Sequence, residues 1–288
     1  MKITYIYSKS NRAFVIMKDM KEIFNINDEQ LDIFCRMSEP DLAHIYEPAK
    51  GLFLAESEKV LTRALAAGYE PEYALIEKKN LPNIEPLLSK FPNVSVYVAQ
   101  YEVLKDITGY HMTGGVLCAM RRKELMSVED ICRGKNRIVF LDGVVNPTNV
   151  GAIFRNAAAL GMDGIILSAD SCDPLYKRSI RVSMGNVFLI PWTKLDKQDS
   201  GYIDRLKELG FEFVATALDE KAMSVKDEKL KEIDKMVICM GSEGYGMKEE
   251  MLKRCDKTVY IPMYNEVDSL NVAAASALAF WELAKERK

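Results

Sequence analysis

Histidines and closely spaced cysteine pairs are scarce in this sequence. Only two histidines occur in 288 residues, and the six cysteines are scattered without a Cys-x-x-Cys pair. Metal sites and disulfide frameworks need such clusters, so we expect no metal ion and reduced, buried thiols. The sequence also lacks any run near the ~20 apolar residues of a membrane span, and its start has no continuous apolar segment typical of secretory signals. We therefore expect a cytoplasmic protein with no membrane partner.

An excess of positive charge is also missing. The 39 basic and 42 acidic residues leave a formal charge of −3, so no global field draws the protein onto nucleic acid. Any nucleic-acid binding must come from local patches. The hydrophobic content of 48% is enough for real cores. The length predicts two domains, because single cores stop growing near ~250–300 residues.

A basic, polar segment at 121–136 divides two α/β regions, and we interpret it as a linker. Before it, residues 49–120 form a small α/β domain. After it, residues 137–288 form a larger α/β domain. Residues 1–48 are an N-terminal extension of unclear role, in which Asp28–Met37 is the one convincing helix.

Short apolar segments predict the strands of both regions. In the larger domain these segments consist almost entirely of apolar residues, which is typical of a parallel sheet covered on both faces. Ligands of such sheets bind beyond the carboxyl ends of the strands. In the smaller domain the predicted strands are 51–55, 73–77, 94–98 and 115–120, with helices at 56–67 and 84–90; in the larger one they are 137–141, 164–168, 187–190, 211–217, 236–240 and 258–261.

The first unusual segment, Asn146-Pro-Thr-Asn-Val-Gly-Ala-Ile-Phe-Arg155, follows a predicted strand and leads into a helix at 148–160. Arg155 projects roughly 120° from the apolar stripe of that helix. In one interpretation Asn149 caps the helix and Arg155 is a solvated surface residue. In the other, Arg155 binds a phosphate with its forked donors.

The second segment, Gly241-Ser-Glu-Gly-Tyr-Gly246, lies between a buried strand and a helix predicted at 247–254. A nucleotide phosphate loop would end in Gly-Lys-Ser/Thr, whereas Glu243 here would repel a phosphate. The order of glycines also fails the dinucleotide fingerprint. S-adenosylmethionine, which has a sulfonium charge and no phosphate, is a better ligand for such a turn. The alternative is a purely structural glycine turn.

The third segment runs from Ile261-Pro-Met through Ser269-Leu-Asn271 into a C-terminal helix that starts near Leu270. Ser269 or Asn271 can cap that helix. Its first turns have almost no polar face, so the helix is expected to be buried all round. Its alanines allow close approach of another element or of a partner subunit.

A fourth segment carries basic residues. Asp173 is expected to cap a helix that has Pro174 at its first position and ends before Gly185. Three cations recur on one face of this helix, either as a solvated face or as a phosphate-binding stripe near the site. They are Lys177, Arg178 and Arg181.

In this order and spacing, the first three segments resemble the motifs of SpoU-type RNA ribose methyltransferases of the SPOUT superfamily, over residues 137–286. Residues 50–120 are more weakly similar to the N-terminal RNA-binding domain of the family, which has a ribosomal-protein-like fold. Ser57 stands where a glycine is usual, and the loop at His111 lacks the usual glutamine-glycine pair. These departures bear on the target RNA.

The resemblance implies a methyl transfer from S-adenosylmethionine to a ribose 2′-hydroxyl of rRNA or tRNA. It also implies a deep trefoil knot in the C-terminal domain, which no sequence pattern predicts, and a homodimer with the site at the subunit interface. By its motifs the cofactor residues are Gly241, Ile261 and Leu270, and the catalytic residues are Asn149, Arg155, Glu243, Ser269 and Asn271.

Arginine is effectively always protonated. Our hypothesis is therefore that Arg155 holds the target phosphate and stabilises the developing alkoxide, while Asn149, Ser269 and Asn271 set the geometry. The proton acceptor is not identified by the sequence.

Two other classes of protein remain as alternatives. A non-catalytic RNA-binding protein would retain the fold with damaged motifs, whereas the motifs here are intact. A dinucleotide-dependent enzyme of the Rossmann type needs its glycine fingerprint after the first strand, where this chain has Asn146-Pro-Thr-Asn149. The RNA and the nucleotide that are modified cannot be deduced from the sequence.

Overall fold

The computed structural model of the chain describes residues 20–46, 51–108, 114–217, 222–242 and 246–285. The chain forms two compact units, the first running to Glu124 and the second starting at Leu125, with Leu175–Lys177 grouped with the first. The change of unit falls inside the segment 121–136 that the sequence assigns to a linker. No helix in the described ranges is long and apolar enough to cross a membrane.

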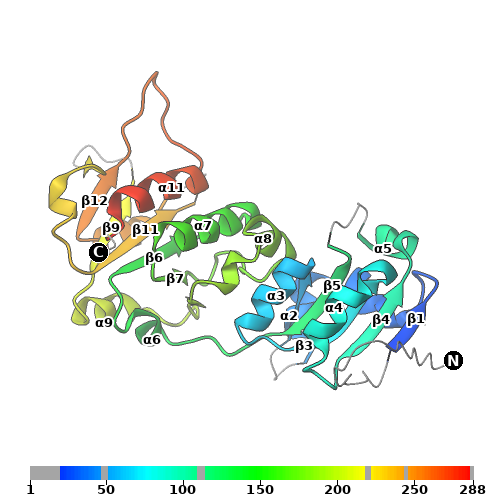
Figure 1. Cartoon of the computed structure of the whole chain (residues 1–288). Coiled ribbons are helices and arrows are strands. Elements are labelled where there is room, and N and C mark those ends of the chain that lie inside the picture. Colours follow the sequence, from blue (N-terminus) through cyan, green and yellow to red (C-terminus); the bar gives the residue numbers. More distant parts are fainter. Residues whose placement is uncertain (1–19, 47–50, 109–113, 218–221, 243–245, 286–288) are drawn as a thin grey trace. The chain divides into compact units, whose positions relative to one another are not determined.

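The first unit contains a five-stranded mixed sheet in the order β1-β4-β3-β5-β2 (Figure 1). Strand β1 pairs in parallel with β4, so part of the region interpreted as an N-terminal extension belongs to this sheet. The predicted helix at 28–37 is a 3-10 turn followed by one α-helical turn. The strands are β1 (Met20–Ile23), β2 (Leu52–Glu56), β3 (Pro71–Glu77), β4 (Ser95–Ala99) and β5 (Val116–Arg121); the helices are η1 (Glu29–Leu31), α1 (Asp32–Cys35), α2 (Glu39–His44), α3 (Glu58–Ala66), η2 (Lys78–Asn80), α4 (Leu81–Leu88) and α5 (Tyr101–Thr108).

Both faces of the first sheet are covered by apolar side chains. Phe34 of α1, Leu42 of α2 and Leu104 of α5 pack with strand residues such as Leu75 in one core cluster. The buried residues of α3 and α4 lie outside this cluster. Alternate strand residues point to opposite faces, which is why β2, β3 and β5 are buried almost throughout.

The second unit contains a seven-stranded parallel sheet in the order β10-β12-β9-β11-β6-β7-β8. A parallel α/β domain was predicted, and this prediction is confirmed. The strands are β6 (Arg137–Asp142), β7 (Gly164–Leu167), β8 (Trp192–Lys194), β9 (Glu212–Thr216), β10 (Met223–Ser224), β11 (Met236–Gly241) and β12 (Lys257–Tyr260); the helices are α6 (Val128–Cys132), α7 (Pro147–Leu160), α8 (Lys177–Val182), η3 (Asn186–Phe188), α9 (Tyr202–Glu208), η4 (Glu228–Leu230), α10 (Glu249–Arg254) and α11 (Val272–Leu283).

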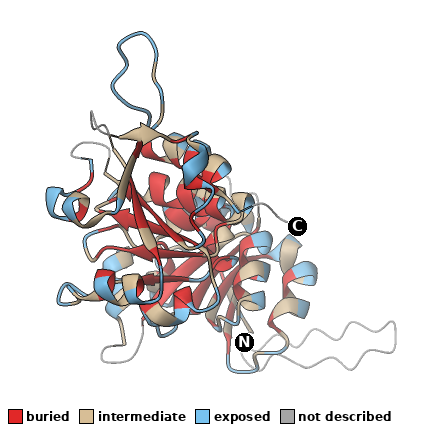
Figure 2. Ribbon diagram, turned by 90° about the vertical axis from the view of Figure 1, so that its left-hand side faces the viewer, coloured by how far each residue is buried: buried red, intermediate tan, exposed pale blue. Residues whose placement is uncertain are grey.

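Helices cover both faces of this sheet, and its central strands are buried (Figure 2). On one face, residues such as Phe140 and Cys239 pack against α6, α9 and α10. Helices α7 and α11 pack against each other on the opposite side from α6 and α9 (Figure 1). None of the six cysteines, all of which lie in the described ranges, forms a disulfide, and Cys118, Cys132 and Cys239 are buried.

Two local predictions for the second unit are wrong. The segment 187–190 is no strand: Val187 and Phe188 lie in the 3-10 turn η3, and the strand β8 follows at Trp192. A short apolar run is compatible with either a strand or a buried turn, and periodicity cannot separate the two. Here Gly185, with φ +78°, starts the turn.

The helix expected from Pro174 starts three residues later, at Lys177. Asp173 therefore does not cap it, and Pro174 is not its first residue. Pro174 and Leu175 are instead buried in the turn before the helix. Burial of two apolar residues outweighs the local helix-start signal.

Candidate active site

Three loops leave the carboxyl edge of the second sheet close to one another. Asp142 at the end of β6 is in register with Gly241 at the end of the neighbouring strand β11. Strand β12 joins the same edge through β9. Because the strands are parallel, the loop into α7, the loop into α10 and the segment 261–271 all start from this edge, where ligands of such sheets bind.

Asn271 connects the third loop to the first turn of α7. Its Oδ1 accepts hydrogen bonds from the backbone N–H groups of Ala273 (2.9 Å) and Ala274 (3.4 Å), so it caps α11. Its Nδ2 donates to Oδ1 of Asn149 at 3.2 Å, across 122 positions of sequence.

Asn149 itself is buried, and it is not a helix cap. Asn146 caps α7 by accepting from the N–H of Thr148 at 2.8 Å. The interpretation of Asn149 as a cap is therefore wrong, because the preceding Pro147 already occupies the first helical position. Asn149 is left to meet Asn271, which makes the pair the polar contact between the first and third segments.

Arg155 lies on the exposed side of α7, as predicted. It follows Thr148 by seven residues, nearly two helical turns, so the two side chains project within about 20° of each other around the helix axis. Thr148 Oγ1 accepts a hydrogen bond from Nε of Arg178 at 2.6 Å. One cation of the predicted basic stripe is thus held on the side of α7 that carries Arg155.

Close packing of α8 on α7 depends on Gly151. A Cβ at this position would lie 2.5 Å from the carbonyl oxygen of Ser179. Ser179 also donates to the carbonyl of Pro147 at 3.0 Å. Of the other two predicted cations, Arg181 is exposed and Lys177 is half-buried at the start of α8.

Ser242 and Gly246, which are the described residues near either end of the glycine loop, are paired with each other. Ser242 and Gly246 exchange two backbone hydrogen bonds, of 2.8 and 2.9 Å. A Cβ on Gly241 would lie 2.3 Å from the backbone nitrogen of Met247, and Gly246 has φ +66°. Glycine is therefore required at both positions. Glu243, predicted to be catalytic, lies outside the described residues.

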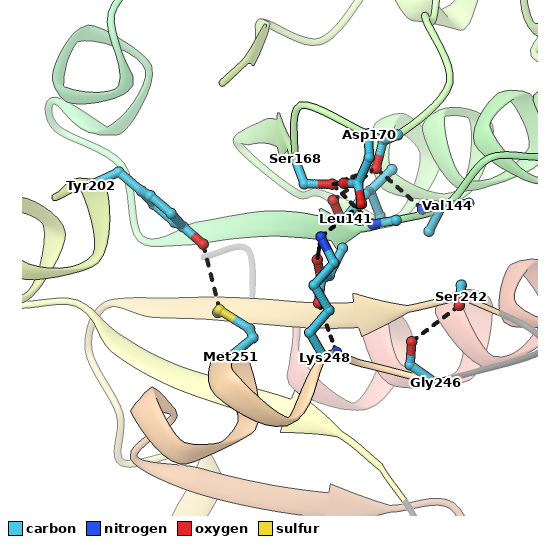
Figure 3. A network of polar contacts seen from close by, with 12 residues as sticks. Leu141, Val144, Ser168, Asp170, Tyr202, Ser242, Gly246, Lys248 and Met251 are labelled. Atoms are coloured by element: carbon cyan, nitrogen blue, oxygen red, sulfur yellow. Dashed lines mark hydrogen bonds and ion pairs between the residues drawn. The ribbon is translucent and has the colours of Figure 1, made fainter. Parts of the chain in front are cut away.

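A buried carboxylate joins the glycine loop to the first segment. Asp142 accepts a hydrogen bond of 2.9 Å from the backbone N–H of Lys248, a residue that is labelled in Figure 3. Nζ of Lys248 donates to Asp170 at 2.6 Å and lies 3.6 Å from Asp142.

The charges of this network stabilise one another. The hydrogen bond to Asp170 raises the pKa of Lys248. Burial opposes ionisation of Asp170, but the hydrogen bonds from Lys248 and Ser168 outweigh it and hold its pKa below the ordinary value. Lys248, which follows the glycine loop, is thus paired with two carboxylates, and their negative charge disfavours a phosphate beside it.

Two buried serines hold the turn that follows Asp142. Ser168 Oγ accepts from the N–H of Gly143 at 2.9 Å, and Ser171 Oγ accepts from the N–H of Val144 at 3.1 Å (Figure 3). Ser171 Oγ also donates to the carbonyl of Leu141 at 3.0 Å. The turn into α7 is therefore fixed by side chains that follow β7.

A cavity of about 450 Å³ opens beside this network, on the side of α9 and α10. Asp142, Asp170 and Lys248 lie in its wall with Tyr202 and Met251. The hydroxyl of Tyr202 donates to the sulfur of Met251 at 3.4 Å (Figure 3), and burial raises the pKa of Tyr202.

The third segment extends away from the body of the second unit (Figures 1 and 2). Ile261 at its start is half-buried, whereas Ser269 and Leu270 near its end are exposed. The structure thus brings Asn271 to Asn149 but leaves Ser269 and Leu270 on the surface.

Comparison with known proteins agrees with this geometry. The profile of the SpoU rRNA Methylase family matches residues 136–281. An uncharacterized tRNA/rRNA methyltransferase of Mycobacterium tuberculosis is 32% identical over 271 residues, which cover 92% of this chain and 91% of that protein. This chain belongs to the SpoU family. Another relative, the 23S rRNA (guanosine-2′-O-)-methyltransferase RlmB of Acinetobacter baylyi, is 27% identical over 87% of this chain and 99% of its own length.

A solved structure shows the same fold. The AdoMet-bound rRNA methyltransferase of Sinorhizobium meliloti superposes with a TM-score of 0.77 at 24% identity, covering 92% of this chain and 97% of that one.

Several residues that surround the predicted motif residues in this SpoU protein were not predicted from its sequence. The network residues missed are Asp142, Ser168, Asp170, Ser171 and Lys248. The available signal was Asp142, a carboxylate placed directly after four apolar strand residues. Nothing in the sequence indicated that its partner is the backbone of residue 248.

Proposed function

We propose that this SpoU protein transfers a methyl group from S-adenosylmethionine to a ribose 2′-hydroxyl of rRNA or tRNA. Family membership and the names of its relatives support the reaction. The observation that carries the proposal to this chain is the hydrogen bond between Asn149 and Asn271, which joins two of the motifs at the carboxyl edge of the sheet. Mapping 2′-O-methyl sites in RNA from cells with and without the protein tests it; identical maps contradict it.

Gly241, Ile261 and Leu270 are proposed to hold the cofactor, which supplies an electrophilic methyl group on its sulfonium. The residues present fit such a ligand. Gly241 is half-buried and Gly246 is exposed, so backbone without a side chain is accessible there, and Ile261 and Leu270 offer apolar surface. The carboxylates around Lys248 disfavour a phosphate.

Calorimetry checks this ligand preference. We expect S-adenosylmethionine to bind and NAD and ATP to show negligible binding, because Lys248, which follows the glycine loop, is paired with the carboxylates of Asp142 and Asp170. Tight ATP binding that is lost when Gly241 is replaced would contradict the assignment.

The reaction forms a bond between the ribose oxygen and the methyl carbon, breaks the sulfur–methyl bond and releases the hydroxyl proton. Arg155 is proposed to hold the target phosphate and to stabilise the developing alkoxide. Asn149, Asn271 and Ser269 set the geometry, and Glu243 is assigned a catalytic role by its motif alone. A non-catalytic RNA-binding protein is the second candidate; it would bind RNA without any methyl transfer.

RNA contacts are proposed for both units. Arg178 and Arg181 are exposed on α8, next to the turn that precedes Asn149, and Lys177 begins the same helix. Cations so placed suit phosphates of the RNA backbone. Residues 49–120 are proposed to bind the RNA substrate.

A homodimer through α11 is proposed as well, and the trefoil knot remains a prediction of the family resemblance. The expectation that α11 is buried all round does not hold within one chain. Phe280 is 0% exposed, but Leu278 and Trp281 are 45% and 71% exposed on one apolar side of the helix. A second subunit on this side would cover them, as in apolar obligate interfaces.

Trp281→Glu is expected to yield folded monomers, because the side chain is outside the core of its own subunit. Phe280→Glu is expected to unfold the second unit. Light scattering coupled to chromatography gives the mass of each variant, and mixing two differently inactivated variants tests whether the site is shared. A wild-type protein that is monomeric and fully active would refute the dimer.

A further inference from the structure

At the end of β6, hydrogen bonds connect the region of the glycine loop to the turn that leads into α7. We propose that Asp142 is a positioning residue for methyl transfer, which locks the glycine loop after β11 against the turn that leads into α7. The inference rests on the proposed function and adds a residue to it.

Asp142 contacts Gly241, where the glycine loop begins, and Lys248, two residues after Gly246. Its backbone is in register with Gly241, where the loop begins. Its carboxylate accepts from the N–H of Lys248, 2.9 Å away, where the loop ends. One residue of β6 therefore fixes the entry and the exit of the loop.

The N–H of Lys248 has a particular need for this acceptor. Lys248 precedes the first residue of α10, and its own side chain makes no cap. N–H groups at the start of a helix have no partner within the helix, and a carboxylate there is favourable. Asp142 supplies that acceptor from another strand.

The turn that follows Asp142 is also held by hydrogen bonds. The next two residues, Gly143 and Val144, donate their N–H groups to the buried hydroxyls of Ser168 and Ser171. The turn into α7 is thus rigid on its own. If the carboxylate contact is lost, the glycine loop is free to move relative to this turn and to Asn149 beyond it.

The contact can be removed from either partner with a matched control. Asp142→Ala removes the acceptor, whereas Asp142→Asn keeps an amide oxygen for the same N–H. Lys248→Pro removes the donor at a residue whose φ of −59° already suits proline, whereas Lys248→Ala removes the ammonium and keeps the N–H.

We expect Asp142→Ala and Lys248→Pro to weaken S-adenosylmethionine binding by about 10- to 100-fold in calorimetry, as for loss of a charge-assisted hydrogen bond. Asp142→Asn and Lys248→Ala should stay within about threefold, because each keeps the hydrogen bond from the N–H of residue 248 and the ammonium of Lys248 is mostly exposed. The KM for cofactor should rise in parallel, with kcat less affected at saturating cofactor.

Thermal unfolding identifies variants that fail to fold, and if Asp142→Ala is one of them the Lys248 pair decides. Wild-type affinity in folded Asp142→Ala or Lys248→Pro overturns the inference. Equal damage by Lys248→Ala and Lys248→Pro also overturns it, because the ammonium would then be responsible. A wild-type protein that binds no S-adenosylmethionine refutes the proposed function itself, and the inference with it.

Discussion

Replacing Arg155 with alanine is expected to lower the rate of methyl transfer by about 10²–10³-fold, the usual effect of removing a group that stabilises developing charge. The side chain is exposed on α7, so the fold should tolerate the change. Arg155→Lys keeps the charge but loses the forked donors, and we expect it to remain at least about tenfold slower than the wild type. Single-turnover methylation of RNA at saturating cofactor measures these rates.

Arg133→Ala is a matched control, because Arg133 is an exposed arginine of the same unit that pairs with Asp130 in the region of α6. It should leave the rate unchanged. Activity of Arg155→Lys close to that of the wild type would defeat the role of a forked donor. Unchanged activity of Arg155→Ala would remove Arg155 from the site altogether.

Arg137→Met is expected to lower the free energy of unfolding of the second unit by about 3–5 kcal/mol, because three carbonyls, two of them in buried hydrogen bonds, lose a charged donor together. Arg137 is 3% exposed. Its guanidinium donates to the carbonyls of Leu283 (2.7 Å), Asp234 (2.8 Å) and Ile233 (3.0 Å). These bonds fasten the end of α11, the helix that Asn271 caps at its other end, to the segment before β11.

Tryptophan fluorescence during urea unfolding measures this change selectively. Both tryptophans of the chain, Trp192 and Trp281, belong to the second unit. The control Arg133→Met removes an arginine that is 79% exposed and should alter stability by less than about 0.5 kcal/mol. An unfolding midpoint of Arg137→Met equal to that of Arg133→Met would show that α11 does not depend on these bonds.

Much of the secondary structure of the second unit was predicted correctly from its sequence, because each element depends on residues that are close together in the chain. The apolar strands β6, β7, β9, β11 and β12 appear where predicted, and polar segments follow β6, β11 and β12 at one edge. Parallel strands put these ends together without any further information. Arg155 was placed correctly for the same reason, since the 3.6-residue period alone determines which side of α7 it occupies.

Some local sequence patterns predicted the wrong conformation or the wrong capping residue, because the surrounding structure determined the outcome. Val187 to Ile190 is apolar enough for a strand, yet it forms a turn because Gly185 reverses the chain there. Asp173 and Pro174 have the composition of a helix start, but the helix begins at Lys177. Asn149 has the right residue type for a cap, and Asn146 is the cap.

The sequence by itself determined most strands of the second unit, the motifs and the family resemblance, since each depends on residues close together in the chain. Only the tertiary structure decided which of those residues meet. Asn149 and Asn271 are 122 positions apart, and the N–H of Lys248 and the carboxylate of Asp142 are 106 apart. Such contacts depend on the order of strands in the sheet and on the packing of α7 against α11. Hydrogen bonds over these separations leave no periodic pattern in the sequence, because their partners are brought together only when the sheet has formed.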